Sequence, residues 1–256
     1  MSYILEVDHL TRAFSDVGVS PQVVLKDISF NLDEGEFLAI FGRAGSGKSM
    51  LLSNLLAMDH ATSGTVRFRG QDVNQLTEIQ MEDIRLNSIG FVSQQFPLQQ
   101  NLTIRDNILQ PAFQAGTLPK SQVEARAEEL MAWAGIEQHA RMRVSNSDET
   151  LLMRAIICRE LINDPALLVL NSISQSIESG EAIDILESVF AYRLKHPIAI
   201  LLTTDDPEIA AYADRVLFFS HGEIKAELQL GRLGDFKAGH QSRVDQLTSQ
   251  IESLDI

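Results

Sequence analysis

The chain has 256 residues, of which 45% are apolar, enough for one large α/β domain with a buried core. Its 35 acidic and 21 basic residues give a formal net charge of −14. Such a surface repels nucleic-acid phosphates and anionic lipids, which excludes binding to nucleic acid through the general surface but leaves room for a local basic pocket.

The N-terminal part of the chain is expected to form β-strands. It opens without a basic and apolar leader, which predicts a cytoplasmic protein. Residues 4–14 and 23–32 alternate apolar and polar side chains in the manner of strands. A turn at residues 33–36 then leads into the apolar run 37–41, which predicts a buried strand.

A glycine-rich segment lies between this strand and a helix-like run at residues 49–58. Its sequence is GRAGSGKS, formed by Gly42, Arg43, Ala44, Gly45, Ser46, Gly47, Lys48 and Ser49. A strand, a glycine loop and a helix in this order are the context of a P-loop, whose backbone N–H groups cradle phosphate oxygens. Lys48 is expected to reach the β- and γ-phosphates, and the Ser49 hydroxyl to ligate Mg²⁺. The alternative is a glycine-rich turn with a chance lysine, although all four motif positions match.

The middle of the chain changes character. Short strands are expected at residues 65–69 and 89–93, whereas residues 102–161 show little strand pattern and several helix-like stretches. This predicts a helical insert within the α/β domain. The chain's only cysteine, Cys158, lies in an apolar run there, so we expect a buried thiol and no disulfide within the chain.

Strand patterns resume in the C-terminal third, at residues 166–170 and 198–202, and no apolar run approaches the length of a membrane span. The tail, residues 231–256, is polar with one amphipathic stretch. Its apolar positions are spaced three, four and three residues apart, at Val244, Leu247, Ile251 and Leu254. The spacing predicts a helix packed on the domain, with a partner-binding helix as the alternative.

From about residue 3 to residue 228, the order of elements resembles the ATPase subunit of an ABC transporter, closest to the lipoprotein-releasing and macrolide-exporter group. Besides the P-loop, the resemblance rests on residues 63–66, 89–94, 101–108 and 154–165. It implies an α/β P-loop NTPase fold, in which a RecA-like core carries an antiparallel β subdomain and a helical subdomain. The implied boundaries are 1–230 for the nucleotide-binding domain, about 101–161 for the helical insert and 231–256 for a C-terminal helical tail.

The resemblance also implies ligands and partners. ATP and Mg²⁺ would be the cofactors, with Phe14 stacked on adenine and Gln94 in contact with Mg²⁺. The alternative for Phe14 is a core residue at the end of a strand. A membrane permease, faced by Gln94, and a second ABC ATPase in a homodimer or heterodimer would be the partners. They would hold the protein at the inner face of the membrane.

Two catalytic motifs of the family are altered here. Asn171 and Ser172 stand where the family has Asp-Glu after an apolar strand, so the metal loses a charge and the attacking water loses its base. Thr204 stands at the position assigned to the switch histidine and has no imidazole to offer the γ-phosphate. Positioned acid–base groups contribute roughly 10²- to 10⁴-fold to a rate, so these changes predict weak or absent hydrolysis.

The signature motif is altered as well. The family's Leu-Ser-Gly-Gly-Gln aligns with residues 147–151, or after a small shift with residues 144–147, and neither segment contains the glycines. Asp148 and Glu149 would instead repel an anion.

Three hypotheses remain for the function. The first is a degenerate ABC ATPase subunit whose ATP occupancy tunes a transport complex. The second is an active ABC ATPase with substitute catalytic groups, for which Asp205 and Asp206 lie near the switch position. The third is a pseudo-ATPase that acts as an interaction protein outside transport. A neighbouring permease gene separates the first from the third, and an ATPase assay tests the second.

Overall fold

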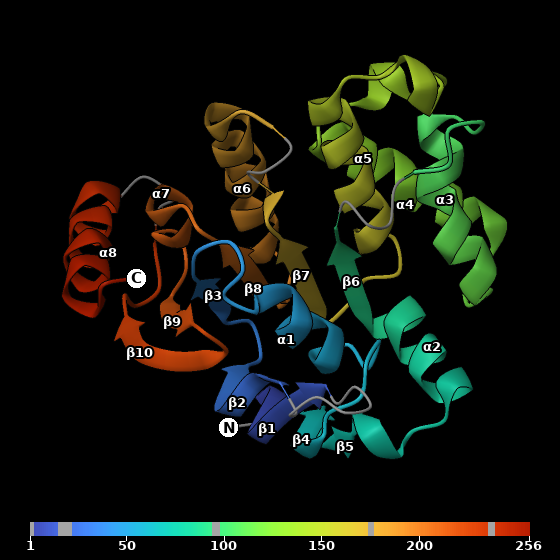
Figure 1. The fold of residues 1–256 in the computed structure, drawn as a ribbon. Helices are drawn as coiled ribbons and strands as arrows, with labels where there is room; N and C mark the ends of the chain where they lie inside the picture. The colour runs from blue at the N-terminus through green and yellow to red at the C-terminus, as the bar shows by residue number, and fades with distance from the viewer. Residues whose placement is uncertain (1–2, 15–21, 94–97, 174–176, 235–238) are drawn as a thin grey trace. The chain divides into compact units, whose positions relative to one another are not determined.

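The structure is a computed structural model that describes residues 3–14, 22–93, 98–173, 177–234 and 239–256. The chain divides into two compact units, each with its own strands and helices (Figure 1). The first unit contains Met1–Met81 and Ala199–Ile256, and the second contains Glu82–Ile198.

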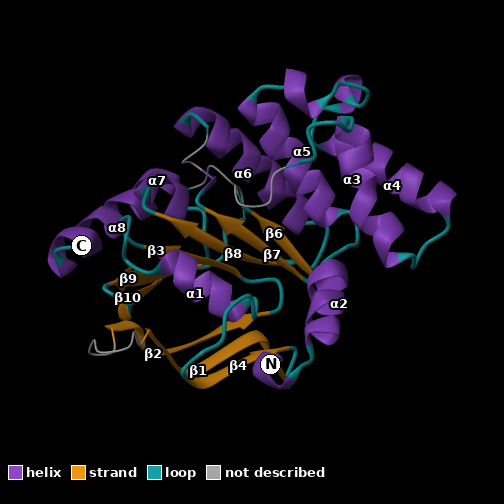
Figure 2. Ribbon diagram, turned by 45° about the vertical axis from the view of Figure 1, so that its right-hand side comes forward, coloured by secondary structure: helices purple, strands orange, loops and turns teal. Residues whose placement is uncertain are grey.

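The first unit contains an antiparallel sheet in the strand order β2-β1-β4-β5, seen with β1, β2 and β4 as adjacent orange strands in Figure 2. Its strands are β1 (Tyr3–Phe14), β2 (Gln22–Asp33), β4 (Ser63–Phe68) and β5 (Gln71–Asp72). A 3₁₀ turn, Val73–Gln75, follows β5. The alternating pattern of β1 and β2 buries most of their apolar side chains, namely Ile4, Leu5, Val7, Leu10, Leu25, Ile28, Phe30 and Leu32.

A second group of strands in this unit has the order β10-β9-β3-β8. These strands are β3 (Phe37–Phe41), β8 (Ala199–Thr204), β9 (Arg215–Ser220) and β10 (Glu223–Gln229). Strand β3 runs parallel to both β8 and β9, and every one of its residues is buried. An unbroken apolar run suits a central parallel strand, because both faces of such a strand are covered.

The helices assigned wholly to the first unit are α1 (Lys48–Leu55), α7 (Pro207–Ala210) and α8 (His240–Leu254). The tail helix α8 packs on its own unit, beside α7, and buries Val244 and Leu247. Its Arg243 is also buried and donates hydrogen bonds to the carbonyls of Ala211, Ala213, Leu230 and Gly231. Helix α2 (Glu78–Ser88) begins in the first unit and ends in the second.

In its described residues, the second unit contains two parallel strands and four further helices. The strands are β6 (Ile89–Val92) and β7 (Leu167–Asn171), with Ile89 opposite Leu167. The helices are α3 (Ile104–Ala115), α4 (Lys120–Trp133), α5 (Glu149–Leu161) and α6 (Ser179–Arg193), with 3₁₀ turns at Glu137–His139 and Val144–Asn146.

Cys158 lies on α5 and is fully buried, as expected from its apolar run. Its thiol donates to the carbonyl of Leu130 at 3.3 Å, and burial raises the pKa of Cys158 to about 12. This thiol is therefore part of the packing of the helices and is not a reactive group.

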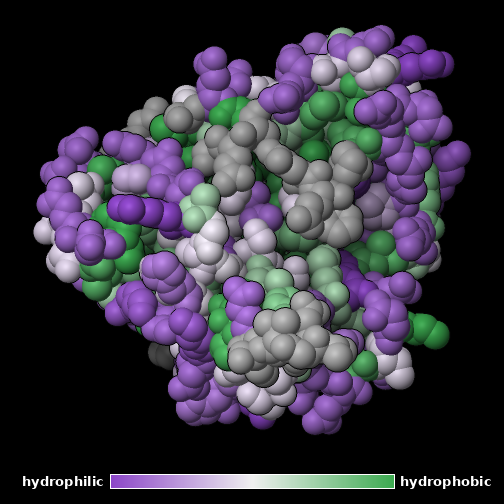
Figure 3. Space-filling model, in the orientation of Figure 1, coloured by the Kyte–Doolittle hydropathy of each residue, from purple (hydrophilic) through white to green (hydrophobic). Residues whose placement is uncertain are grey.

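Hydrophilic side chains cover much of the face drawn in Figure 3, in keeping with the acidic composition. Within the described ranges, no helix combines the length and apolar character needed to cross a membrane.

Candidate functional site

The glycine-rich segment occupies the connection from β3 to α1. Gly45 and Gly47 have positive φ angles, of 78° and 108°, which side chains disfavour. A Cβ on Gly42 would lie 2.2 Å from the carbonyl oxygen of Phe219, so only glycine fits there. The backbone of this loop therefore has the shape that a phosphate cradle needs, and glycine is the reason.

Among the described residues, no side chain caps the N-terminus of α1. Gly47 is the N-cap residue and supplies no side-chain hydrogen bond, so first-turn N–H groups remain for a ligand. The Ser46 hydroxyl is buried and has no hydrogen-bond partner among the described residues. Unpaired N–H groups and a buried hydroxyl at a helix N-terminus fit the oxygens of a phosphate.

Lys48 is only 7% exposed and folds back onto the loop. Its Nζ donates to the carbonyls of Gly42 and Arg43, the second at 3.1 Å. Burial lowers the pKa of Lys48, and the negative charge of Asp205 partly opposes this effect. A buried ammonium held by neutral carbonyls lacks the full counter-charge that an anion would bring.

Two turns that are distant in the sequence brace the loop. The N–H of Gly42 donates to the carbonyl of Thr204 at 3.0 Å, and the N–H of Gly222 donates to the carbonyl of Ser46 at 2.9 Å. A Cβ on Gly222 would lie 1.8 Å from the carbonyl oxygen of Val24. Sequence reasoning missed both braces, and the one signal for either of them is the glycine at position 222.

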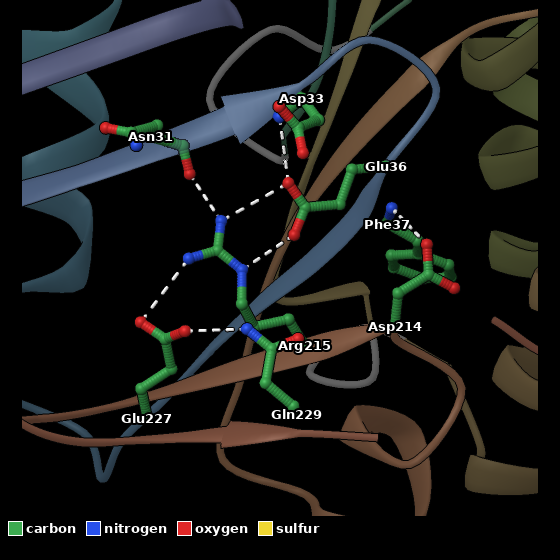
Figure 4. Close-up of polar contacts among 8 residues, drawn as sticks. All are labelled: Asn31, Asp33, Glu36, Phe37, Asp214, Arg215, Glu227 and Gln229. Atoms are coloured by element: carbon green, nitrogen blue, oxygen red, sulfur yellow. Dashed lines mark hydrogen bonds and ion pairs between the residues drawn. The ribbon is translucent and has the colours of Figure 1, made fainter. Parts of the chain in front are cut away.

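The start of β3 is fixed by a polar network, drawn in Figure 4. Arg215 donates to both carboxylate oxygens of Glu36, at 2.6 and 3.2 Å, and Glu36 also accepts the N–H of Asp33 at 2.8 Å. Asp214 accepts the N–H of Phe37 at 2.9 Å. The strand that leads into the loop is thus anchored at its first residue.

Phe14 ends β1 and is 41% exposed, so it is a surface residue and not part of the core. The guanidinium of Arg12 lies over its ring, 4.5 Å from the centroid, and donates to Asp59 at 2.9 Å. Because the ring is exposed and held by a neighbouring cation, it is able to act as a stacking platform.

Thr204 is the last residue of β8 and is 1% exposed. Its hydroxyl accepts the N–H of Asp206 at 3.0 Å, and the Asp206 carboxylate caps α7 by accepting the N–H of Glu208 at 2.9 Å. Asp205 lies between them and is exposed. The hydroxyl of Thr204 is therefore engaged in its own turn, and Asp205 carries the exposed side chain.

Asn171 and Ser172 lie in the second unit, at the end of β7. Ser172 has a φ of 51°, a left-handed conformation that is uncommon for a residue with a side chain. Its hydroxyl lies 3.5 Å from the Asn171 side-chain oxygen. The pair supplies neither a carboxylate nor a group that is basic at neutral pH.

The segment aligned with the signature motif begins α5. Asp148 is the N-cap residue, and its carboxylate accepts the N–H of Leu151 at 2.8 Å. The hydroxyl of Thr150 donates to the carboxylate of Glu181 on α6. The chain's own carboxylate thus caps the N-terminus of α5, and its negative charge disfavours an anion at this helix end.

The two residues predicted to bind metal differ in how far the structure describes them. Ser49 is exposed in the first turn of α1, while Gln94 lies outside the described residues. Within the described ranges, no group of three or more His, Cys, Asp or Glu residues is arranged to hold a metal ion. Arg43 and Ala44 are exposed at the tip of the loop.

Comparison with known proteins identifies the family. The family model described as "ABC transporter" matches residues 25–174. The chain is 34% identical over 228 residues to a macrolide export ATP-binding/permease protein MacB of Mannheimia succiniciproducens, which covers 88% of this chain and 35% of MacB. It therefore spans about a third of that protein. It is also 31% identical to the ABC transporter ATP-binding protein YxdL of Bacillus subtilis, over 90% of this chain and 89% of YxdL.

The same relationship is found among solved structures. The dimeric post-hydrolysis structure of the ATP-binding cassette MJ0796, bound to ADP and Pi, superposes with a TM-score of 0.81 at 26% identity. The match covers 90% of this chain and all of that one. The fold is that of the α/β P-loop NTPases, and the chain belongs to the ABC transporter family.

Proposed function

We propose that this chain is the ATP-binding subunit of an ABC transporter complex, and that it binds ATP at residues 42–49 with little or no hydrolysis. The observation that carries the proposal is the contrast between the phosphate loop and the catalytic positions that the resemblance implies. The phosphate loop is complete and open, whereas the positions for the metal carboxylate, the base and the histidine hold Asn171, Ser172 and Thr204.

Nucleotide binding is supported by three features of the first unit. Gly45 and Gly47 shape the loop, the N-terminus of α1 is open, and Lys48 is positioned to exchange its carbonyl contacts for phosphate oxygens. Ser49 and Gln94 would hold Mg²⁺, which neutralises phosphate charge when bound. Phe14 would stack on the adenine.

The proposal of weak hydrolysis rests on chemistry and not on a single position. The amide of Asn171 lacks the charge of a metal-binding carboxylate, and the hydroxyl of Ser172 cannot accept a proton at neutral pH. The Thr204 hydroxyl is held in its own turn. An active ATPase with substitute groups would have to use Asp205, because the carboxylate of Asp206 caps α7.

The relatives suggest the partners. MacB joins an ATP-binding part to a permease in its name, and a further relative, at 27% identity, is named the bacitracin export ATP-binding protein BceA of Halalkalibacterium halodurans. We therefore propose a membrane permease as partner, with a second ABC ATPase as a homodimer or heterodimer mate, at the cytoplasmic face of a membrane. The boundaries 1–230, 101–161 and 231–256 belong to the same proposal.

Calorimetry of ATP binding tests the nucleotide site. Lys48→Ala should weaken ATP binding by about 10- to 150-fold, the equivalent of roughly 1.5–3 kcal/mol for a hydrogen bond to a charged group. Lys26→Ala is the matched control, because it removes an exposed lysine that pairs with Glu223 in the same unit. Equal affinity of Lys48→Ala and the parent would refute the site.

Cross-linking tests the permease. Cysteines introduced at Gln99 and Leu102, near the start of α3, should capture a membrane protein from cells that express the native complex. Capture of soluble proteins alone would favour a pseudo-ATPase outside transport.

A further inference from the structure

The phosphate loop and Asp205 each follow a strand that ends at the same edge of one sheet. Strands β3 and β8 are parallel neighbours, and Phe41 and Thr204, their last residues, are in register. Gly42 and Asp205 are therefore the first residues beyond the two strands. In open α/β sheets, ligands bind beyond the carboxyl ends of the strands. Asp205 and the phosphate loop both lie at this edge of the sheet.

A hydrogen bond fixes this arrangement. The N–H of Gly42 donates to the carbonyl of Thr204 at 3.0 Å, immediately before the peptide bond to Asp205. The polar groups on either side have partners in their own turn: the hydroxyl of Thr204 accepts from Asp206, and the carboxylate of Asp206 accepts from Glu208. Asp205 is thus the acidic residue of this run that is exposed beside the loop.

The charge of Asp205 reaches the phosphate site. It is the carboxylate that opposes the lowering of the Lys48 pKa by burial. A carboxylate placed there repels the bare polyphosphate of a nucleotide. A divalent cation reverses this effect, because Mg²⁺ is held by one or two carboxylates together with substrate phosphates.

We infer that Asp205 makes nucleotide binding at residues 42–49 depend on a divalent cation, by placing a negative charge beside the phosphate loop. The inference rests on the proposed nucleotide site and adds a binding residue to it. The groups present fit a hydrated cation: Ser49 offers an exposed hydroxyl in the first turn of α1, and Asp205 offers an exposed carboxylate.

The test compares Asp205→Asn with the parent by calorimetry of ATP binding, in excess Mg²⁺ and in excess EDTA. The measured quantity is the ratio of the dissociation constant in EDTA to that in Mg²⁺. In Asp205→Asn, ATP binding should weaken in Mg²⁺ and tighten in EDTA, so that this ratio falls about tenfold or more. Asp206→Asn is the matched control, since asparagine also caps helices and the ratio should not change.

Two results would overturn the inference. An unchanged ratio in Asp205→Asn would show that the carboxylate does not act on the metal. If Asp205→Asn binds ATP more tightly by a similar factor in Mg²⁺ and in EDTA, the Asp205 carboxylate only repels phosphate. Lys48→Ala separates this failure from failure of the nucleotide site, because it should weaken binding in both conditions. A parent protein that binds no ATP in either condition would refute the site and the inference together.

Discussion

Two helix N-termini in this protein have opposite arrangements. Helix α1 begins at a glycine cap with no side-chain hydrogen bond, beside a buried hydroxyl without a described partner. Helix α5 begins at Asp148, whose carboxylate accepts the N–H of Leu151 at 2.8 Å. The first therefore lacks a side-chain cap, and the second is capped by a carboxylate of its own chain.

The same structural feature, a helix N-terminus, is therefore used in two different ways. Both helices expose N–H groups and a positive dipole end at their first turn. The sequence GRAGSGKS places no capping side chain at the N-terminus of α1 and adds a lysine, whereas Asp148 accepts the N–H of Leu151 in α5 and adds negative charge. This contrast agrees with the proposal that the chain binds ATP at residues 42–49 and that residues 147–151 do not act as the family's signature motif.

The largest effect should come from attempts to restore turnover. Ser172→Glu alone should leave ATPase activity near background, because Asn171, Thr204 and the capped N-terminus of α5 stay unchanged and groups that act as a unit are grossly non-additive. A variant that combines Asn171→Asp, Ser172→Glu, Thr204→His and a glycine-containing segment at residues 147–151 should exceed it by roughly 10²-fold or more.

Steady-state phosphate release measures both variants. Lys48→Ala in the combined background is the control for contaminating ATPase. Full activity from Ser172→Glu alone would show that the remaining positions are not defects, and the alignment of residues 144–151 would have to be redrawn.

A second experiment separates the contribution of the adenine base to ATP binding from that of the phosphates. Phe14→Ala should weaken ATP binding by about 5- to 150-fold, which corresponds to roughly 1–3 kcal/mol for stacking of a base on an aromatic ring. Binding of inorganic tripolyphosphate should not change, because Lys48 and the loop remain.

Phe113→Ala is the matched control, since Phe113 is similarly exposed and lies on α3. Equal losses of ATP and tripolyphosphate affinity in Phe14→Ala would mean that the variant disturbs the loop and that Phe14 does not stack on the base.

A third, smaller effect is expected on the free energy of unfolding, which should respond differently to changes at the two helix N-termini. Asp148→Ala should lower the free energy of unfolding by about 1 kcal/mol, the usual worth of an N-cap, and Asp148→Asn by less. Ser46→Ala should cost nothing in the nucleotide-free protein, because the hydroxyl that it removes is buried without a described partner. Urea unfolding measures all three, and a loss at Ser46 as large as that at Asp148 would contradict the contrast.

The smallest effect concerns pH. Burial lowers the pKa of Lys48 in the folded protein below its ordinary value of 10.5, so folding is opposed while Lys48 is protonated. As pH rises through the lowered pKa toward 10.5, this opposition is relieved. The stability of the parent relative to Lys48→Met should therefore rise between neutral pH and pH 10.5 in urea unfolding without nucleotide. A relative stability that falls with pH would contradict the burial of the charged form.

The phosphate loop could be predicted from sequence because its signal is local: a strand, three glycines, a lysine and a helix follow one another. The hydrogen bonds that brace the loop could not be predicted, because the carbonyl of Thr204 and the N–H of Gly222 come from distant segments that meet only in the folded protein. The sequence also placed a negative charge at Asp148, but not the hydrogen bond by which that charge closes α5. Gln94 lies outside the described residues, so its role stays a prediction.

The chemical state of the bound nucleotide tests directly whether the chain binds ATP with little or no hydrolysis. The parent protein and Lys48→Ala are incubated with labelled ATP and Mg²⁺, separated from free nucleotide, and the bound label is identified after increasing times. We expect the parent to retain the label as ATP with little conversion, and Lys48→Ala to retain almost none. Conversion of bound ATP to ADP at about 1 per second or faster, within the ordinary range of enzymes, would contradict the account.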